Sequence, residues 1–247
     1  MIPPTSIDGT DITGATIDGT DVQEITVDGQ TVFSAVPNVP SSANLVFHLD
    51  ASQESLSNNQ TTTTITDFSG NNNDVTGDSV TYKTNQINGL PAFDFNEDIL
   101  DNTMSLSSPI VVGIVVKTTA NNQQQRLIGS KTSLTDLRIQ FDTGEFTNYY
   151  LLISNSSRLE YFATPPLNTY ISLVFVADGS NSGIYVDGIL ELSGTTAAGS
   201  YDALSVGSTD GTAFRGIVGS VAEILVYDTS INISDLNNYL SSKYATF

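Results

Sequence analysis

The sequence contains one loop whose side chains could bind a metal ion. Residues 67–74 read Asp-Phe-Ser-Gly-Asn-Asn-Asn-Asp, which places carboxylates and side-chain amides around a glycine. Calcium prefers oxygen ligands from carboxylates, amide side chains and backbone carbonyls. We therefore predict a calcium site formed by Asp67, Asn71, Asn73 and Asp74. The alternative is that these side chains hydrogen-bond their own backbone in Asx-turns, which needs no ion.

A second group of residues could bind carbohydrate. Sugar-binding sites stack an aromatic ring on the sugar and hold its hydroxyl groups with planar polar side chains. Suitable residues lie close together in the middle of the chain, and we predict that they form a ligand-binding face: Arg138, Tyr149, Tyr150, Arg158 and Tyr161. Strand alternation limits this set, because neighbours along a strand point to opposite faces.

Catalytic side chains are scarce. The chain has no cysteine and one histidine, His48. A single histidine within a strand is more often packed or hydrogen-bonded than catalytic, so we expect His48 to be structural. A glycosidase needs two carboxyl groups on either side of a sugar. One cluster of acidic residues in the sequence could supply such a pair. Its members are Asp94, Glu97, Asp98 and Asp101.

The charge of the chain excludes some partners. It has 27 acidic and 8 basic residues, a formal net charge of −19. Nucleic acid is not expected as a partner, because binding it requires Lys and Arg to neutralise phosphates. Such a charge is best tolerated in molar salt, where the screening length falls to about 3 Å, so we predict a high-salt environment; the alternative is an ordinary acidic soluble protein. The sequence lacks a long apolar segment and a signal-like start, so neither membrane insertion nor a secretory signal is expected.

Strands must position these residues. Short apolar or alternating runs are separated by polar loops, which is typical of packed antiparallel sheets. The expected strands span residues 45–49, 62–68, 110–116, 126–129, 137–141, 149–153, 159–163, 169–177, 184–192 and 203–206. Within 184–192, Asp187-Gly188 predicts a tight hairpin turn. The run 221–227 is apolar and β-branched, which predicts a central strand covered on both faces. Ser234 is then expected to begin a short helix as its N-cap, with Leu236 and Tyr239 on one side.

Four motifs together indicate a known fold. The closing segment GSVAEILVYDTSINISDLNNYLSSKY, residues 219–244, resembles the last strand and terminal helix of concanavalin A-like, laminin-G-like jelly-roll domains. Three further motifs follow the order typical of that family: LVFHLDAS from residue 45, ITDFSGNNNDV from residue 65 and GIYVDGILEL from residue 183. The resemblance implies an all-β fold for residues 45–247, a two-sheet antiparallel jelly-roll sandwich with a short C-terminal helix. The catalytic branch of this family has a Glu-x-Asp-x-Glu strand, which is absent here, so no enzyme activity is expected.

The N-terminal segment contains an internal repeat with a spacing of ten residues. The sequence Ile-Asp-Gly-Thr-Asp-Ile at 7–12 recurs at 17–22 and, more loosely, at 27–32. An Asp-Gly pair between β-branched residues predicts a tight hairpin. The pattern resembles a short module of tailed-virus virion proteins, notably those of salt-loving archaea. We therefore predict an attachment segment at 1–36 and a proline-containing linker at 37–44; the alternative is an extra hairpin packed on the sandwich.

These features predict a non-enzymatic structural protein on the surface of a virion, outside the cell. Residues 1–36 would bind other virion proteins, and the sandwich would contact a glycan or glycoprotein on the host cell surface. We expect a homo-oligomer. Two alternatives remain open, since this fold serves several functions: a purely structural capsid or tail decoration protein without glycan binding, and a glycoside hydrolase or cellular adhesin.

Overall fold

The fold is known from a computed structural model of the chain. The structure describes residues 38–120, 124–131, 136–142, 149–207 and 216–245, and short strand segments between residues 6 and 34. No helix in these described parts is long and apolar enough to cross a membrane. Strands dominate, and the long helix is α1 (Ile233–Tyr244) near the C-terminus.

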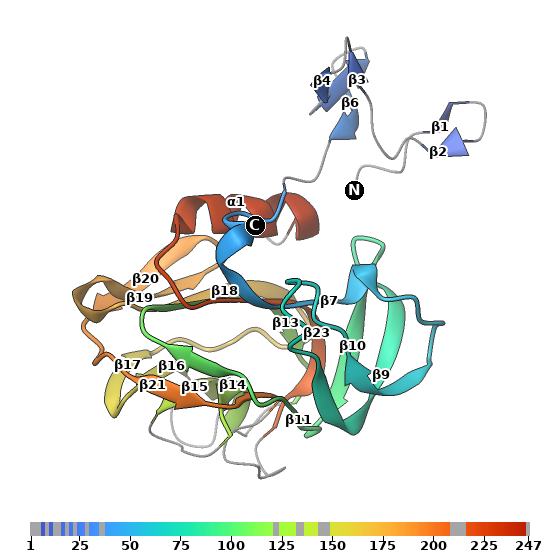
Figure 1. Cartoon of the computed structure of the whole chain (residues 1–247). Helices are drawn as coiled ribbons and strands as arrows, with labels where there is room; N and C mark the ends of the chain where they lie inside the picture. The colour runs from blue at the N-terminus through green and yellow to red at the C-terminus, as the bar shows by residue number, and fades with distance from the viewer. Residues whose placement is uncertain are drawn as a thin grey trace.

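The strands form two packed layers that belong to one curled antiparallel sheet (Figure 1). The layer beneath α1 consists of β20 (Ile189–Gly194), β19 (Ser182–Val186), β18 (Tyr170–Ala177), β13 (Ile110–Thr118), β23 (Val218–Tyr227) and β10 (Leu90–Asn96), with β7 (Leu45–Asp50) also paired to β23. The other layer consists of β11 (Leu100–Asp101), β22 (Leu204–Val206), β14 (Gln124–Ser130), β15 (Leu137–Asp142), β16 (Tyr149–Ser154) and β17 (Ser157–Tyr161). The expected all-β sandwich is confirmed.

One long strand joins the two layers. β9 (Val75–Ile87) pairs with β10 through residues 81–87 and with β11 through Thr76 and Gly77, so the sheet continues from layer to layer. β8 (Thr61–Ile65) also pairs with β9, and a small separate sheet is made by β12 (Ser105–Ser107) and β21 (Ser200–Asp202). β9 was not predicted from the sequence. Polar residues fill most of it, including an exposed run at 76–79, so it lacks the apolar alternation by which strands are recognised.

The central strands β13 and β23 are buried on both faces, as the apolar run at 221–227 predicts. On β13, Val112 and Ile114 point into the space between the layers, while Val111 and Val115 pack in the cluster beneath α1. This alternation follows from the strand geometry, in which successive side chains point to opposite faces. A strand that serves two cores must be largely apolar, and these strands are, apart from Lys117 and Thr118 in β13 and Ser220 and Glu223 in β23.

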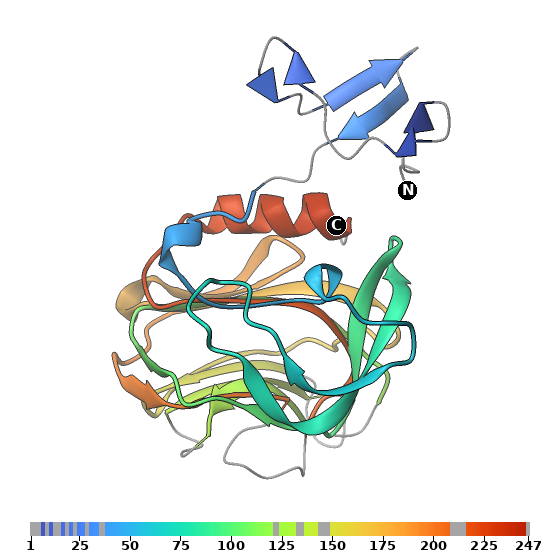
Figure 2. The same cartoon turned by 45° about the vertical axis from the view of Figure 1, so that its right-hand side comes forward.

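The helix α1 covers the outer face of this layer (Figure 2). Its buried side chains repeat at helical spacing and include Leu236, Tyr239 and Leu240. The predicted N-cap, Ser234, is wrong. Asn232 is the N-cap and accepts a hydrogen bond from the Ser234 N–H, because an Asn side chain satisfies a free amide of the first turn as well as Ser does.

A β-bulge in β23 turns two consecutive residues toward α1. Val115 pairs with Glu223 and Val116 with Val221, which leaves Ala222 as an extra residue on β23. Ala222 packs in the cluster beneath α1, and Glu223 also points to that side, where Tyr239 of α1 hydrogen-bonds to it. Bulges re-aim side chains in this way. The bulge therefore places a carboxylate between the sheet and the helix.

The N-terminal repeat forms three two-stranded hairpins, as its Asp-Gly spacing predicts. They pair β1 (Ser6–Ile7) with β2 (Thr10–Asp11), β3 (Thr16–Ile17) with β4 (Thr20–Asp21), and β5 (Glu24–Val27) with β6 (Gln30–Ser34). Within the predicted linker, Val39 packs against the cluster beneath α1 and a 3₁₀ turn, η1 (Ser42–Asn44), leads into β7. The described part of the linker thus lies on the sandwich.

Candidate functional site

A row of polar side chains crosses five neighbouring strands of the layer beneath α1. The register aligns Tyr170 of β18 with Lys117 of β13, Lys117 with Ser220 of β23, Ser220 with Asp94 of β10, and Asp94 with Thr81 of β9. Residues directly opposite each other in an antiparallel sheet share a face. These five side chains, called the polar row below, therefore lie side by side on the same face of the layer as the cluster beneath α1.

Contacts within the polar row hold its charged groups in place. Ser220 donates a hydrogen bond of 2.5 Å to Asp94 Oδ1. The Lys117 ammonium lies 4.8 Å from the centre of the Tyr170 ring and 3.5 Å from Gln86 Oε1. Burial raises the pKa of Tyr170 to about 12, although the Ser220 hydroxyl partly offsets this and the charge of Asp94 adds to it. The phenol is thus a neutral hydrogen-bond donor near neutral pH.

Four residues of the polar row, Thr81, Asp94, Lys117 and Ser220, line an open hollow of about 470 Å³. Further residues line it with amide, hydroxyl and carboxylate groups: Ser79, Gln86, Asn96, Asp98 and Thr119. Gly219 also lines it, and a Cβ there would lie 2.0 Å from the Lys117 carbonyl oxygen, so only glycine lets β23 approach β13 this closely. Mixed donors and acceptors suit a ligand whose hydroxyl groups both donate and accept hydrogen bonds.

The predicted ligand-binding face at residues 138–161 is divided by the structure. Arg138 and Arg158 both register with position 153, so they share the outer face of their layer. Tyr150 registers with Tyr161, and both belong to the interior, where Tyr150 is 2% exposed. The prediction that Tyr150 is available to a ligand is therefore wrong. Alternation puts it in the core, where its ring stacks on that of Tyr161 with centroids 5.9 Å apart.

The remaining predicted residues of that face have neighbours of their own. Arg158 is exposed and forms an ion pair with Glu160 two positions along. Tyr161 is half-buried, and its pKa is raised chiefly by a hydrogen bond with Glu191. Tyr149 lies in β16 opposite Asp142, and its side chain is outside the described part of the structure. The structure does not bring these residues together into one site.

In the predicted calcium loop, four protein donors surround Asp67, which is 7% exposed. Its Oδ1 accepts the N–H groups of His48 and Ser69, and its Oδ2 accepts the Ser69 hydroxyl and the Asn73 N–H. A carboxylate offers about four lone-pair sites, so these bonds use the acceptor capacity of Asp67. This favours the Asx-turn alternative at that residue.

The other predicted ligands of the loop attach it to β7. Asn71 and Asn73 donate their side-chain amides to the carbonyl oxygens of Leu45 and Val46. Asp74 accepts the N–H of Asp67 and, with Asn73, lines an open hollow of about 530 Å³. Calcium binding by Asp67, Asn71, Asn73 and Asp74 stays a prediction, which a chelator experiment can decide.

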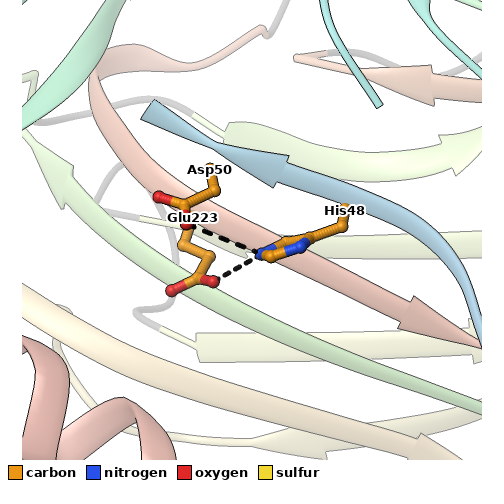
Figure 3. A group of neighbouring side chains, drawn as sticks. All are labelled: His48, Asp50 and Glu223. Carbon is orange, nitrogen blue, oxygen red and sulfur yellow. Dashed lines mark hydrogen bonds and ion pairs between the residues drawn. The ribbon is translucent and has the colours of Figure 1, made fainter. Parts of the chain in front are cut away.

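A cluster of buried ionisable side chains lies between β7, β23 and α1 (Figure 3). His48 Nε2 lies 2.6 Å from Glu223 Oε1 and 4.0 Å from Asp50 Oδ2. Tyr239 of α1 donates to the same Glu223 oxygen at 2.7 Å. Lys243, on the last turn of α1, places its ammonium 2.7 Å from Asp50 Oδ2 and 3.1 Å from Glu223 Oε2.

The arrangement of His48, Asp50 and Glu223 alone would suit a divalent metal ion, since their ligand atoms lie within 4.8 Å of one another. However, the Lys243 ammonium already lies against both carboxylates. A metal ion would have to share this space with a second cation, so the cluster does not fit one. His48 is 2% exposed, in keeping with the structural role expected for it.

Electrostatics in the cluster follow from burial and pairing. Burial alone would raise the pKa of Asp50, but the Lys243 ammonium and hydrogen bonds from Ser52 and Gln53 hold that pKa below its ordinary value. Burial and the nearby Glu223 carboxylate raise the pKa of Tyr239 well above its usual range. The tyrosine is therefore a permanent donor to Glu223.

Sequence reasoning missed both the polar row and the Lys243 contact. Asp94 and Asp98 were noted as members of an acidic group, which is the one signal for the hollow. Lys117 and Ser220 sit in apolar runs without a local motif, so only the pairing of β13 with β23 brings them together. Lys243 and Asp50 are 193 residues apart.

No protein-family model and no curated protein matches the chain. Solved structures do. Domain 4 of AbnA, a GH43 extracellular arabinanase from Geobacillus stearothermophilus in complex with arabinotriose, is 16% identical, with a TM-score of 0.61 over 79% of this chain and 98% of that domain. Trypanosoma rangeli sialidase in complex with sialic acid is 14% identical, with a TM-score of 0.59 over 90% of this chain and 36% of the sialidase.

A third similar structure is the binding domain of a toxin. The binding domain of botulinum neurotoxin DC in complex with rat synaptotagmin II is 12% identical, with a TM-score of 0.56 over 82% of this chain and 52% of that one. Identities this low show a shared jelly-roll β-sandwich fold and nothing finer. They support the resemblance stated from the sequence motifs at the level of architecture.

Proposed function

We propose that this protein is a non-enzymatic glycan-binding β-sandwich and that the hollow beside the polar row is its binding site. The single observation on which this rests is the register that aligns Tyr170, Lys117, Ser220, Asp94 and Thr81 across five strands. A site built on paired strands is rigid, so its donors and acceptors are positioned before a ligand arrives. Solved proteins of the same fold were determined with arabinotriose and sialic acid, which adds support.

The charges of the hollow favour a neutral sugar. Two carboxylates, those of Asp94 and Asp98, face one ammonium, that of Lys117. An anionic ligand would meet this excess of negative charge, and the chain as a whole has a net charge of −19. A hydroxyl-rich neutral sugar can donate hydrogen bonds to the carboxylates and accept one from Lys117, while the Ser220 hydroxyl stays bonded to Asp94.

A binding role suits the carboxylates better than a hydrolytic one. Asp94 uses Oδ1 to hold Ser220, and Asp98 uses Oδ2 to accept the N–H of Asn96. Both groups are fixed as hydrogen-bond acceptors by the sheet itself. A general acid must instead keep a proton to give to the leaving group. We therefore assign the hollow to recognition.

The wider setting that we propose is display on a virion surface in high salt, as a homo-oligomer. Its support is the repeated hairpin pattern of residues 6–34, which resembles modules of tailed-virus virion proteins, and the net charge. A single hairpin of this length is marginal in water, so it requires a packing partner. Removing residues 1–36 should then lower the number of chains per native particle, calculated from the native mass in molar salt; an unchanged number would argue against attachment through this segment.

Glycan binding is tested with a glycan array probed in high salt and at physiological salt. Binding to neutral glycans, followed by calorimetry with the best one, would support the proposal. Incubation of that glycan with the protein, followed by analysis of the sugar products, tests the absence of hydrolysis. A protein that binds no glycan under either salt condition would instead support the purely structural alternative.

A further inference from the structure

Three side chains of the buried cluster lie in contact, with Lys243 between Asp50 and Glu223. The Lys243 Nζ atom lies 2.7 Å from Asp50 Oδ2 and 3.1 Å from Glu223 Oε2. The side chains of Lys243, Asp50 and Glu223 are 8%, 3% and 0% exposed. Asp50 ends β7, Glu223 lies at the bulge of β23, and Lys243 lies on the last turn of α1. The Lys243 amine and the carboxyl groups of Asp50 and Glu223 thus lie together in a site that is almost closed to solvent.

The two oxygens of Asp50 have different surroundings. Its Oδ1 accepts the Ser52 N–H at 3.0 Å and the Ser52 hydroxyl at 2.7 Å. Its Oδ2 faces Lys243 and accepts from the Gln53 amide. Two fixed donors on one oxygen stabilise negative charge that develops there during attack on the carboxyl carbon. Oδ1 is therefore suited to remain as a carbonyl oxygen, and Oδ2 to leave.

Glu223 is held so that one oxygen is free to move protons. His48 and Tyr239 both bind its Oε1, at 2.6 and 2.7 Å. This fixes the carboxylate and turns Oε2 toward the Lys243 nitrogen. A positioned carboxylate at this distance can act as a general base and then as a general acid.

We propose that Lys243 and Asp50 condense into an intramolecular amide bond, with Glu223 as the catalytic proton carrier. Glu223 Oε2 takes a proton from the Lys243 ammonium, and the neutral amine attacks the Cγ atom of Asp50. The C–Oδ2 bond then breaks as protons from the nitrogen pass through Glu223 to Oδ2. One ammonium and one carboxylate give one amide and one water, so charge and atoms balance and no oxidant or cofactor is required.

The folded structure supplies what such a condensation lacks in solution. Holding the two groups in contact replaces an encounter in water, which in well-oriented systems corresponds to effective concentrations of about 10⁵–10⁸ M. Burial also keeps water from the product, which disfavours hydrolysis of the amide. The Lys131–Asp101 ion pair makes a useful comparison, since its atoms are 3.0 Å apart but Lys131 is 47% exposed and the described contacts place no second carboxylate on it.

The decisive measurement is the mass of the intact, denatured full-length chain after prolonged incubation of the folded protein. The expected mass is lower than the sequence mass by one water molecule, and fragmentation should find a branched peptide that joins Lys243 to Asp50. A mass equal to that of the sequence, in protein with native circular dichroism, would overturn the proposal and leave an ordinary buried ion pair. The Lys131–Asp101 pair should stay unlinked in either case.

Variants separate the roles of the three residues. Lys243→Arg keeps a positive charge and should restore the full sequence mass, as should Glu223→Gln through loss of the proton carrier. Asp50→Asn retains a reactive carbonyl and should lose one ammonia molecule in place of water. A linked product in Glu223→Gln at the rate of the unmodified chain would remove Glu223 from the reaction. Since the unmodified chain decides the main question, a variant that fails to fold does not obscure it.

Discussion

Ser220 of β23 donates its hydroxyl hydrogen to Asp94 Oδ1 of β10, at 2.5 Å. The contact leaves Asp94 Oδ2 without a hydrogen bond among the described contacts, and both residues line the hollow. Asp94 is therefore the residue whose change should affect a ligand most and the fold least, because it is half-buried and does not belong to the core.

Asp94→Ala should weaken glycan binding about 10- to 100-fold. A hydrogen bond to a charged group contributes about 1.5–3 kcal/mol, and about 1.4 kcal/mol corresponds to a tenfold change in affinity. Calorimetry with a neutral glycan checks this. Asp202→Ala is the matched control, since it removes an exposed carboxylate from the small sheet of β12 and β21. Equal affinities of the two variants would place the ligand elsewhere.

Gly219→Ala should lower both stability and glycan affinity. The new Cβ would lie 2.0 Å from the Lys117 carbonyl oxygen, so β23 and β13 must separate there. Overpacking of this kind costs about 1–3 kcal/mol, and the shift displaces Lys117 from Ser220. Urea unfolding measures the first effect and calorimetry, well below the unfolding transition, the second. Unchanged affinity in a destabilised variant would show that the ligand does not depend on this strand pair.

Asp67→Ala should destabilise the sandwich by about 1–3 kcal/mol, because donors that Asp67 now satisfies would be left without an acceptor in a buried place. Asp67→Asn should be milder, since its amide oxygen still accepts. Urea unfolding in the presence and absence of a chelator completes the test. If the Asx-turn alternative holds, the chelator changes nothing; a calcium-dependent rise in stability of the unmodified chain would establish a calcium site.

Asp187→Asn should be neutral or slightly stabilising near pH 7. Burial raises the pKa of Asp187 above its ordinary value of 3.8, although the Ser172 N–H partly offsets this. The folded chain thus binds this proton more tightly than the unfolded one, so ionisation costs stability as pH rises through the folded pKa. An asparagine side chain avoids that cost and tolerates the left-handed turn conformation at φ 47°.

The pH dependence provides the measurement. The Asp187→Asn variant should be more stable than the unmodified chain at neutral pH by about 0.5 kcal/mol or less, since the site is half exposed and solvent screens it. The difference should vanish as pH falls below 3.8, where the folded and unfolded forms both keep the proton. A loss of stability in the variant at neutral pH would mean that the carboxylate charge is required by the turn.

Strand positions could be predicted where the pattern is local. The apolar runs of β13, β18 and β23 are long enough to be recognised, and the Asp187-Gly188 pair marks the hairpin between β19 and β20. α1 follows from helical spacing, with its start misplaced by two residues because both Asn232 and Ser234 are good caps. β9 was not predicted because its pairing with β8, β10 and β11, and not a pattern in its own side chains, makes it a strand.

The candidate sites could not be predicted, for a different reason. Strand alternation predicts that some tyrosines of the 138–161 region are buried, but it does not say whether the odd- or the even-numbered positions face the core. In the structure Tyr150 lies in the core. The polar row depends on registers between strands far apart in sequence. Lys243 contacts Asp50 only because the helix α1, the strand β7 and the bulge of β23 come together in the fold. Such contacts carry no signal in a window of neighbouring residues.

A hydrogen bond holds the chain in place where it enters the sandwich. The Tyr227 hydroxyl donates to the Pro40 carbonyl oxygen at 2.9 Å, and β7 then pairs with β23 from Leu45 to Asp50. Tension applied through the hairpin segment would reach this tyrosine first and would next peel β7 from β23 one residue after another. The separation of β7 from β23 ends at Asp50, where the ion pair with Lys243 connects the strand to α1. The force would therefore act on the helix before it acts on the polar row.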